Sequence, residues 1–298
     1  MSAQKVITSL VSKAIANAQP FYSVEFFPPK NPQNLAPFFG EVEKLKQLNP
    51  LFASVTYGAG GTTSDTTLHI TSELAAMGIT PMAHLTCVGA TSHSIKKYLS
   101  DLEAANVTSI LALRGDQPQD CPDYDWSKGE FKHASDLVEF INQHFPHFDV
   151  GVASYPSPHP ESPTFSDDRE AAAFKLKQSD FAVTQLFFDS REYENYVSSL
   201  KRRDIHKPVI PGIMPIQSFE SLKRIMMLSG GNIPSQLYIS LEEAHEKGGK
   251  EAVREKGLEF AAKQIKTLTE EYGAPGIHLY TLNNAKLCLE LVEAVKAL

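Results

Sequence analysis

The 298-residue sequence predicts a single α/β domain, a (β/α)8 TIM barrel over residues 1–298 with an extra helix within residues 1–20. Two observations predict this fold. Short apolar runs alternate with longer stretches of helical period, which is typical of parallel sheets with right-handed crossovers. Eight such units fill the 298 residues, which suits a closed barrel. The first run is followed by Pro28-Pro29 and lacks the glycine fingerprint of an open dinucleotide-binding sheet.

Each predicted strand is a short run rich in apolar residues, and each predicted helix repeats apolar residues at helical spacing. The strands are expected at residues 22–27, 52–57, 81–86, 109–114, 150–155, 181–188, 208–213 and 276–282. The helices are expected at residues 35–48, 65–76, 92–105, 133–144, 168–178, 191–203, 218–227, 250–272 and 284–297. The charged stretch 242–256 is interpreted as a solvated connection that leads into a helix.

The N-terminal segment ends in an Ala-x-Ala pattern that imitates a signal-peptide cleavage site. However, Lys13 interrupts its apolar stretch. Apolar residues recur there at helical spacing instead, namely Val6, Leu10, Val11, Ala14 and Ile15. We therefore expect a short amphipathic helix packed on the barrel, and a cytoplasmic protein.

The composition excludes several functional classes. The net charge is −7 and Lys and Arg form no cluster, so nucleic acid is not expected as a partner. No apolar run approaches the roughly 18 residues of a membrane helix, so no membrane interaction is expected. Cys87, Cys121 and Cys288 form no Cys-x-x-Cys pair and favour a reducing compartment over a disulfide scaffold. No metal site is expected, because His and Cys residues lack ligand spacing.

Polar residues gather where the predicted strands end, and the active site of such a barrel lies at that end. They are Glu25, Thr56, Tyr57, His84, Thr86, Arg114, Gly115, Asp116, Tyr155, His159, Glu161, Gln185, Tyr280 and Asn283. Because strands inside a barrel are otherwise mostly apolar, this series predicts an enzyme.

Several of these residues also have a purely structural interpretation. Glu25 is either a carboxylate paired with Arg or Lys in the barrel floor, or a general acid whose pKa is raised by burial. Arg114 and Asp116 either form a simple ion pair or hold a polar ligand. His84 taken alone is more often a satisfied core or rim histidine than a ligand. The residues alone indicate a barrel enzyme and leave its reaction open.

Eight short motifs occur in order at the predicted strand ends. They are Glu25-Phe-Phe-Pro-Pro, Ser54-Val-Thr-Tyr-Gly, His84-Leu-Thr-Cys, Leu113-Arg-Gly-Asp, Tyr155-Pro with His159-Pro-Glu, Thr184-Gln185, Pro211-Gly-Ile-Met-Pro and Tyr280-Thr-Leu-Asn. Together they resemble the methylenetetrahydrofolate reductase family over nearly the whole chain. The length resembles the bacterial form, which is the catalytic barrel without the regulatory domain of eukaryotic relatives.

The resemblance implies a flavoprotein that reduces 5,10-methylenetetrahydrofolate to 5-methyltetrahydrofolate, which supplies methyl groups for methionine synthesis. It implies FAD as the cofactor and NADH or NADPH as the reductant. The nicotinamide and the folate would use the same flavin face in turn, in a ping-pong cycle. Relatives form homo-oligomers, and the same is expected here.

The resemblance also implies roles for individual residues. Glu25 would be the general acid that protonates N10 of the folate, and Asp116 would stabilise the resulting cation near the flavin. The apolar neighbours Val24 and Phe26 fit a raised pKa for Glu25. The positions that match substrate-binding residues are Gln185, Phe219, Thr56 and Tyr280. Those that match FAD-binding residues are Tyr57, Ala59, His84, Arg114, Gly115, Asp116, Ala134, Tyr155, His159 and Lys177, with Asp168 or Glu170 as the acidic residue.

Two departures from the family pattern have consequences. Asn284 stands where the family commonly has an arginine that would hold the glutamate tail of folate, and Lys223 or Arg224 is the alternative cation. The turn at residues 178–181 is shorter than usual, which moves the end of the helix that carries Lys177.

The runner-up interpretation is a different class of enzyme. A flavin-free barrel lyase or aldolase would use Glu25 and Asp116 as acid and base. Such a protein would be colourless, whereas a flavoprotein would be yellow.

Overall fold

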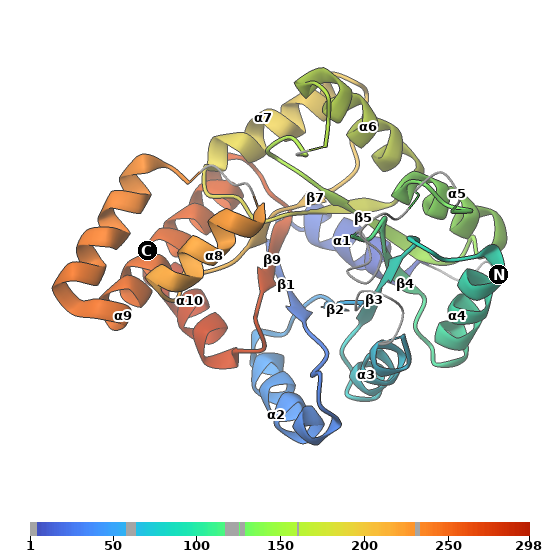
Figure 1. Ribbon diagram of the computed structural model, residues 1–298, viewed down its shortest axis with the longest axis horizontal. Helices are drawn as coiled ribbons and strands as arrows, with labels where there is room; N and C mark the ends of the chain where they lie inside the picture. The colour runs from blue at the N-terminus through green and yellow to red at the C-terminus, as the bar shows by residue number, and fades with distance from the viewer. Residues whose placement is uncertain (1–4, 58–63, 117–124, 126–128, 160, 230–232) are drawn as a thin grey trace.

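The computed structural model describes residues 5–57, 64–116, 125, 129–159, 161–229 and 233–298, and it confirms the predicted barrel (Figure 1). Neighbouring strands are parallel throughout the sheet. The strands β1 to β9 are Phe21–Phe26, Ala53–Val55, Pro81–Thr86, Ser109–Leu113, Asp149–Ser154, Phe181–Thr184, Val209–Ile210, Gly212–Ile213 and Gly276–Tyr280. β1 pairs with both β2 and β9, so the first and last strands lie side by side.

The seventh predicted strand is split by Pro211 into β7 and β8. β7 pairs with β6 and β8 pairs with β9, so the two short strands bring the ends of the sheet together. Proline lacks the N–H that a sheet ladder requires, which explains the break. The Pro211 carbonyl accepts a hydrogen bond from the His278 N–H at 2.9 Å, and this bond joins the strands across the closure.

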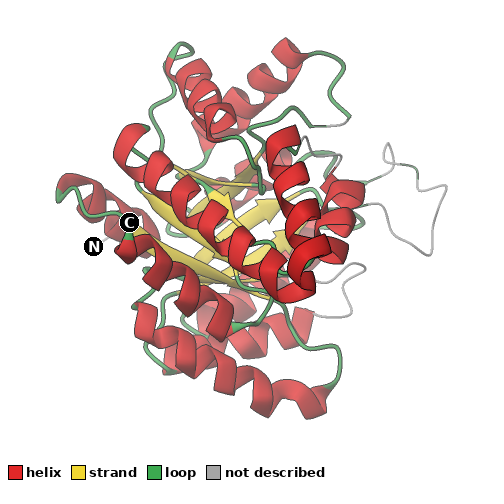
Figure 2. Cartoon of the chain, turned by 90° about the vertical axis from the view of Figure 1, so that its left-hand side faces the viewer, coloured by secondary structure: helices red, strands yellow, loops and turns green. Residues whose placement is uncertain are grey.

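The helices surround the strands (Figure 2). The α-helices α1 to α10 are Val6–Ala16, Leu35–Leu45, Ser64–Ala76, Ser92–Ala104, Ala134–His144, Phe165–Gln178, Ser190–Lys201, Phe219–Ser229, Ser235–Lys266 and Ala285–Ala297. Among the helices in the described ranges, none combines the length and hydropathy needed to cross a bilayer.

Helix α9 corrects one sequence-based expectation. The stretch 242–256, predicted as a solvated connection, is helical within α9 and bends at Gly248 and Gly249. Gly249 has φ of 62°, a conformation that glycine adopts without strain. The first half of α9 is held because Leu237 and Leu241 are buried in the same hydrophobic cluster as Phe219.

The helix α1 covers the amino-terminal end of the barrel, behind the strands in the view of Figure 1. The predicted helix is confirmed, but its buried face differs. Ile7 and Val11 pack with barrel-interior residues such as Phe52, whereas Val6 and Ile15 are 42% and 48% exposed. Burial of Ile7 was missed because the sequence pattern had placed its neighbour Val6 on the apolar face.

The start of α1 is fixed by the buried carboxylate of Asp149 on β5. Its Oδ2 accepts hydrogen bonds from the Ile7 N–H and the Ser109 hydroxyl, and its Oδ1 accepts from the N–H and hydroxyl of Thr8. Asp149→Asn replaces one acceptor oxygen with an amide donor, so we expect the free energy of unfolding to fall by about 2 kcal/mol in urea titrations. Asp204→Asn, at a 99% exposed carboxylate, is the control and should leave stability unchanged. Equal stabilities of the two variants would contradict a capping role.

Candidate active site

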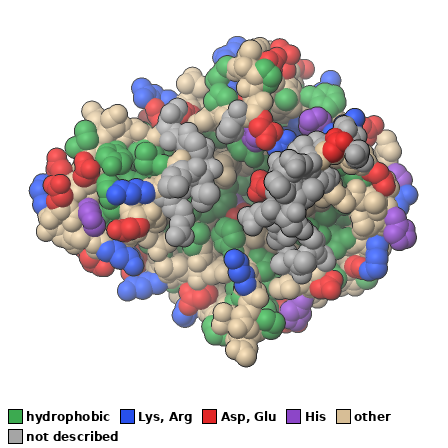
Figure 3. All heavy atoms as spheres, in the orientation of Figure 1, with side chains coloured by type: hydrophobic (Ala, Val, Ile, Leu, Met, Phe, Trp, Pro, Cys, Tyr) green, Lys and Arg blue, Asp and Glu red, His purple; other side chains and the backbone are tan. Residues whose placement is uncertain are grey.

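The carboxyl ends of the strands open on the face shown in Figure 3, which is hollowed near its centre. Side chains on barrel strands alternate between the interior and the surrounding helices. On β1, Glu25 contacts interior side chains, whereas Val24 and Phe26 belong to the hydrophobic layer beneath the helices. The interior therefore changes from apolar near α1 to polar toward this face.

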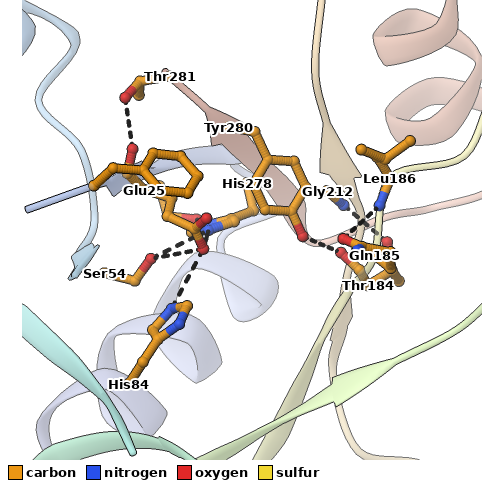
Figure 4. A network of polar contacts seen from close by, with 12 residues as sticks. Glu25, Ser54, His84, Thr184, Gln185, Leu186, Gly212, His278, Tyr280 and Thr281 are labelled. Carbon is orange, nitrogen blue, oxygen red and sulfur yellow. Dashed lines mark hydrogen bonds and ion pairs between the residues drawn. The ribbon is translucent and has the colours of Figure 1, made fainter. Parts of the chain in front are cut away.

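Glu25 lies at the centre of a polar cluster built by four strands (Figure 4). Its Oε2 is 3.3 Å from Nε2 of His84 on β3 and 3.6 Å from Nε2 of His278 on β9. The hydroxyl of Ser54 on β2 donates to the same oxygen at 3.4 Å. These four residues are at most 6% exposed. Within the described ranges, the basic partners of Glu25 are thus histidines, and not the Arg or Lys of the structural interpretation.

The pKa of Glu25 corrects a second expectation. Burial by itself raises this pKa, but hydrogen bonds and positive charge from His278 and His84 outweigh it and lower the pKa to about 2. The prediction of a raised pKa was wrong because Val24 and Phe26, its neighbours in sequence, face away from the carboxylate. Glu25 is therefore ionised at neutral pH, and a proton must reach it before it can act as a general acid.

Tyr280 and Gln185, which are predicted to bind substrate, lie beside this cluster (Figure 4). The Tyr280 hydroxyl donates to the Thr184 carbonyl at 2.7 Å, and Thr184 Oγ1 accepts from the Gly212 N–H at 2.9 Å. A Cβ at Gly212 would meet the Thr184 carbonyl at 2.4 Å and the Tyr280 ring at 2.5 Å, so only glycine permits this contact. Gln185 is exposed and its Oε1 accepts from the Leu186 N–H (Figure 4). Burial, with the charge of Glu25, raises the pKa of Tyr280.

Arg114, Gly115 and Asp116 follow β4 at the same face. The Arg114 guanidinium donates to both carboxylate oxygens of Glu161, at 2.7 and 2.9 Å. This bidentate pair ties the end of β4 to the segment after β5. Gly115 has φ of +90°, and a Cβ there would lie 2.6 Å from the Val88 side chain. Asp116 is exposed.

Arg169 on α6 is a residue that sequence reasoning missed. Its guanidinium is 2% exposed and donates to the carbonyls of Tyr155 at 3.1 Å and Pro156 at 2.5 Å. It also pairs with Asp168 at 2.6 Å. The other oxygen of Asp168 accepts from the His159 N–H at 2.8 Å. The Asp168–Arg169 pair therefore fixes the segment that carries Tyr155 and His159.

The orientation of α6 gives the alternative residues on that helix different surroundings. Asp168 is buried at 7% exposure and faces the strand ends, whereas Glu170 is exposed and accepts from a serine hydroxyl on its own helix. Lys177, predicted to bind FAD, is exposed. Lys175 is turned inward instead, and its Nζ donates to the carbonyl of Ala153 on β5 at 2.6 Å. Burial lowers the pKa of Lys175 to about 8.

Other predicted residues reach the same face. Thr56 and Tyr57 follow β2, and the Tyr57 ring packs edge-on against a tyrosine of α4 at 5.6 Å between centroids. Ala134 is the buried first residue of α5. The rings of Tyr155 and His159 pack edge-on at 4.8 Å. These five residues thus lie at the strand-end face, on elements from β2 to α5 and after β5.

Phe219, at the start of α8, is buried within a hydrophobic cluster at 6% exposure. His245 of α9 stacks on its ring at 5.3 Å, and the ammonium of Lys223 lies 4.7 Å from the ring centroid. Stacking of Phe219 on a substrate stays a prediction, and it requires one of these neighbours to be displaced.

Three remaining residues bear on the predicted folate tail and FAD sites. The Asn284 side chain caps α10 by accepting from the Leu287 N–H at 3.1 Å, and its amide donates to Gln217 at 3.5 Å. Ala59 and the side chain of Arg224 lie outside the described residues.

Ser23, Ser54 and His278 were also missed as members of the site. The sequence did carry a signal for Ser23, because period-2 alternation places it on the side of β1 that carries Glu25. The strand register that sets Ser23 opposite His278 is not visible in the sequence.

Fold and geometry together define an α/β-barrel protein with an acid–base cluster at the carboxyl end of its strands. A sequence model of methylenetetrahydrofolate reductase matches residues 10–296. The chain belongs to the methylenetetrahydrofolate reductase family.

Relatives of this family match along most of the chain. It is 32% identical over 293 residues to a probable methylenetetrahydrofolate reductase (NADPH) of Caenorhabditis elegans, covering 96% of the chain and 43% of that protein. It is 30% identical to the 5,10-methylenetetrahydrofolate reductase of Pectobacterium carotovorum, covering 89% of the chain and 86% of that protein. The chain spans about half the length of the eukaryotic relatives it matches.

A solved structure supports the fold. An uncharacterized protein from Clostridium thermocellum that binds two copies of 5-methyl-5,6,7,8-tetrahydrofolic acid superposes with a TM-score of 0.67 at 13% identity. The superposition covers 96% of this chain and 98% of that one.

Proposed function

We propose that the protein reduces 5,10-methylenetetrahydrofolate to 5-methyltetrahydrofolate with NADH or NADPH, using FAD, and so supplies methyl groups for methionine synthesis. The observation that carries this proposal is the buried Glu25 between two imidazoles, in a chain of this family. Opening the folate five-membered ring requires a proton at N10, and the cluster holds titratable protons where the strands end.

The residues present fit FAD at the strand ends. Lys175 offers an inward ammonium next to β5, which suits the phosphates of FAD. The positive φ of Gly115 leaves a backbone turn without a side chain beside Thr86. Tyr57, His84, Arg114, Asp116, Ala134, Tyr155, His159 and Asp168 would complete the cofactor site. When bound, FAD supplies the hydride that it receives from the nicotinamide.

The side chains of the protein would handle the proton and the orientation of the folate. Glu25, once protonated, transfers its proton to N10 and the ring opens to a cation at N5. Asp116 stabilises that cation by its negative charge. Gln185 and Tyr280 offer hydrogen-bonding groups that orient the pterin, and Thr56 contacts the nicotinamide side.

An absorbance experiment tests the proposed function. The purified protein, supplemented with FAD, is expected to show a flavin band that bleaches with NADH or NADPH under anaerobic conditions. Adding methylenetetrahydrofolate should restore the band. A protein that takes up no FAD, or a reduced flavin that the folate does not reoxidise, would overturn the proposal and favour the flavin-free lyase.

Lys175 gives a prediction about pH. Phosphate binding requires the ammonium form, and the pKa of Lys175 in the FAD-free protein is about 8. FAD affinity should therefore fall by about tenfold per pH unit above 8, because binding must then take up a proton. Lys175→Met should weaken FAD binding by about 10- to 100-fold at pH 7 and abolish this pH dependence.

Lys177→Met is the matched control, since it removes the same charge from the exposed face of the same helix. Fluorescence titration of FAD measures both variants. An equal loss of affinity in the two would assign the effect to net charge and not to Lys175.

The proposal includes a cytoplasmic homo-oligomer, which rests on the family resemblance. Sedimentation velocity of the FAD-loaded protein measures the oligomeric state.

A further inference from the structure

The His278 ring is held on both of its nitrogen edges. Its Nδ1 is 2.8 Å from the hydroxyl of Ser23 on the neighbouring strand. Its Nε2 faces Glu25 at 3.6 Å and the Ser54 hydroxyl at 3.4 Å. Phe52 stacks on the ring at 5.8 Å between centroids, with 21° between the planes. At 0% exposure, the ring has one packed orientation and no contact with solvent.

These contacts offer a partner to each ring nitrogen in either protonation state of His278. In the imidazolium form of His278, Nδ1–H donates to Ser23 and Nε2–H points at Glu25. Transfer of the Nε2 proton to Glu25 leaves a neutral His278, which still donates from Nδ1 to Ser23, and a carboxylic acid at Glu25. The exchange conserves protons and charge, and it requires Nε2 and Oε2, which are 3.6 Å apart, to approach to hydrogen-bond distance. The bond to Ser23 is kept in both states.

We propose that His278 is a positioning residue that supplies the proton which Glu25 delivers to the substrate, and that Ser23 fixes the ring for this exchange. This inference rests on the proposed function, in which Glu25 protonates N10 of the folate. His278 acts only through Glu25, because the ring is buried beneath it.

The two histidines beside Glu25 differ in their access to solvent. The groups that face the Glu25–His278 pair are Ser23 from β1, Ser54 from β2, His84 from β3 and Tyr280 from β9. His84 is 6% exposed, whereas His278 is fully buried. Of the two imidazoles, His278 is thus the one that solvent does not reach.

Two variants test the proposal in the FAD-loaded protein. His278→Asn removes the proton donor, and Ser23→Ala removes only the hydroxyl that fixes the ring. We expect His278→Asn to slow folate-driven reoxidation of the flavin by about 10²-fold, with flavin reduction by NAD(P)H within about twofold of wild type. The pH at which reoxidation declines should move down by about one unit, because a carboxyl group holds its proton less firmly than an imidazole. Ser23→Ala should change the same quantities in the same direction by smaller amounts.

Imidazole nitrogen NMR of ¹⁵N-histidine-labelled protein gives a readout independent of turnover. The His278 signals are identified by their loss in His278→Asn. In Glu25→Gln the pH at which His278 titrates should fall, because the carboxylate that stabilises the imidazolium is gone. His206→Asn, at a 66% exposed histidine, is the control for the substitution itself.

The outcomes separate the inference from the function on which it rests. Failure to bind FAD or to reduce folate in the wild-type protein overturns the proposed function, while the NMR titration still tests the proton exchange. Folded, FAD-loaded Ser23→Ala and His278→Asn with wild-type reoxidation rates and pH profiles would overturn the inference and leave His278 a packing residue. If His278→Asn does not fold, Ser23→Ala and the titration in Glu25→Gln decide.

Discussion

Glu25→Gln is expected to leave reduction of the flavin by NAD(P)H at the wild-type rate and to slow folate reduction by about 10²- to 10⁴-fold. The amide keeps the shape of the side chain between His84 and His278 but cannot donate an acidic proton. Hydride transfer from the nicotinamide needs no proton from this residue, so the two half-reactions should separate. Anaerobic stopped-flow absorbance measures each of them in turn.

Glu170→Gln is the matched control, because it makes the same change at an exposed carboxylate of α6. It should leave both half-reactions within about twofold of wild type. Normal folate turnover in Glu25→Gln would refute the general-acid role. Loss of both half-reactions would instead indicate that the variant no longer holds FAD.

Arg169→Leu is expected to lower the free energy of unfolding by about 3–5 kcal/mol, because it leaves a buried carboxylate without its cation. Asp168 would keep its hydrogen bond from the His159 N–H but lose its charged partner. The carbonyls of Tyr155 and Pro156 would lose their donors as well. Urea denaturation followed by circular dichroism measures the change.

Arg191→Leu tests whether the loss of stability depends on burial of the ion pair. Arg191 also pairs with a carboxylate, that of Asp189, but its side chain is 77% exposed. That variant should change stability by less than about 1 kcal/mol. Arg169→Lys should recover part of the loss, because an ammonium restores the charge without the fork of donors. If Arg169→Leu is as stable as Arg191→Leu, the contacts that Arg169 makes with Asp168 and with the segment after β5 contribute nothing to the free energy of unfolding.

The fold could be predicted from the sequence because its signals are local. Apolar runs and helical periods mark where elements lie, and strand ends then mark where polar side chains converge. Residues such as Glu25, Gln185 and Tyr280 were therefore placed at the correct face. The split of the seventh strand depends on Pro211 and the bend in α9 on Gly248 and Gly249, and the effects of these residues on longer elements become visible only with coordinates.

What could not be predicted depends on orientation and on partners far away in the sequence. Lys175 and Lys177 differ by two positions on one helix, and only the packing of α6 shows which one turns inward. The pKa of Glu25 was misjudged because its neighbours in sequence are not its neighbours in space. Two of those spatial neighbours, His84 and His278, come from other strands.

The position of the acid cluster also bears on how the protein matures. Ser23 and His278 meet although they are 255 positions apart, because β1 and β9 adjoin where the ring closes. Contacts so distant in sequence form only after a large loss of chain entropy. A growing polypeptide on the ribosome therefore cannot assemble the contacts among Ser23, His278 and Glu25 until β9 has emerged and docked. The cluster around Glu25 is thus completed only when the barrel closes.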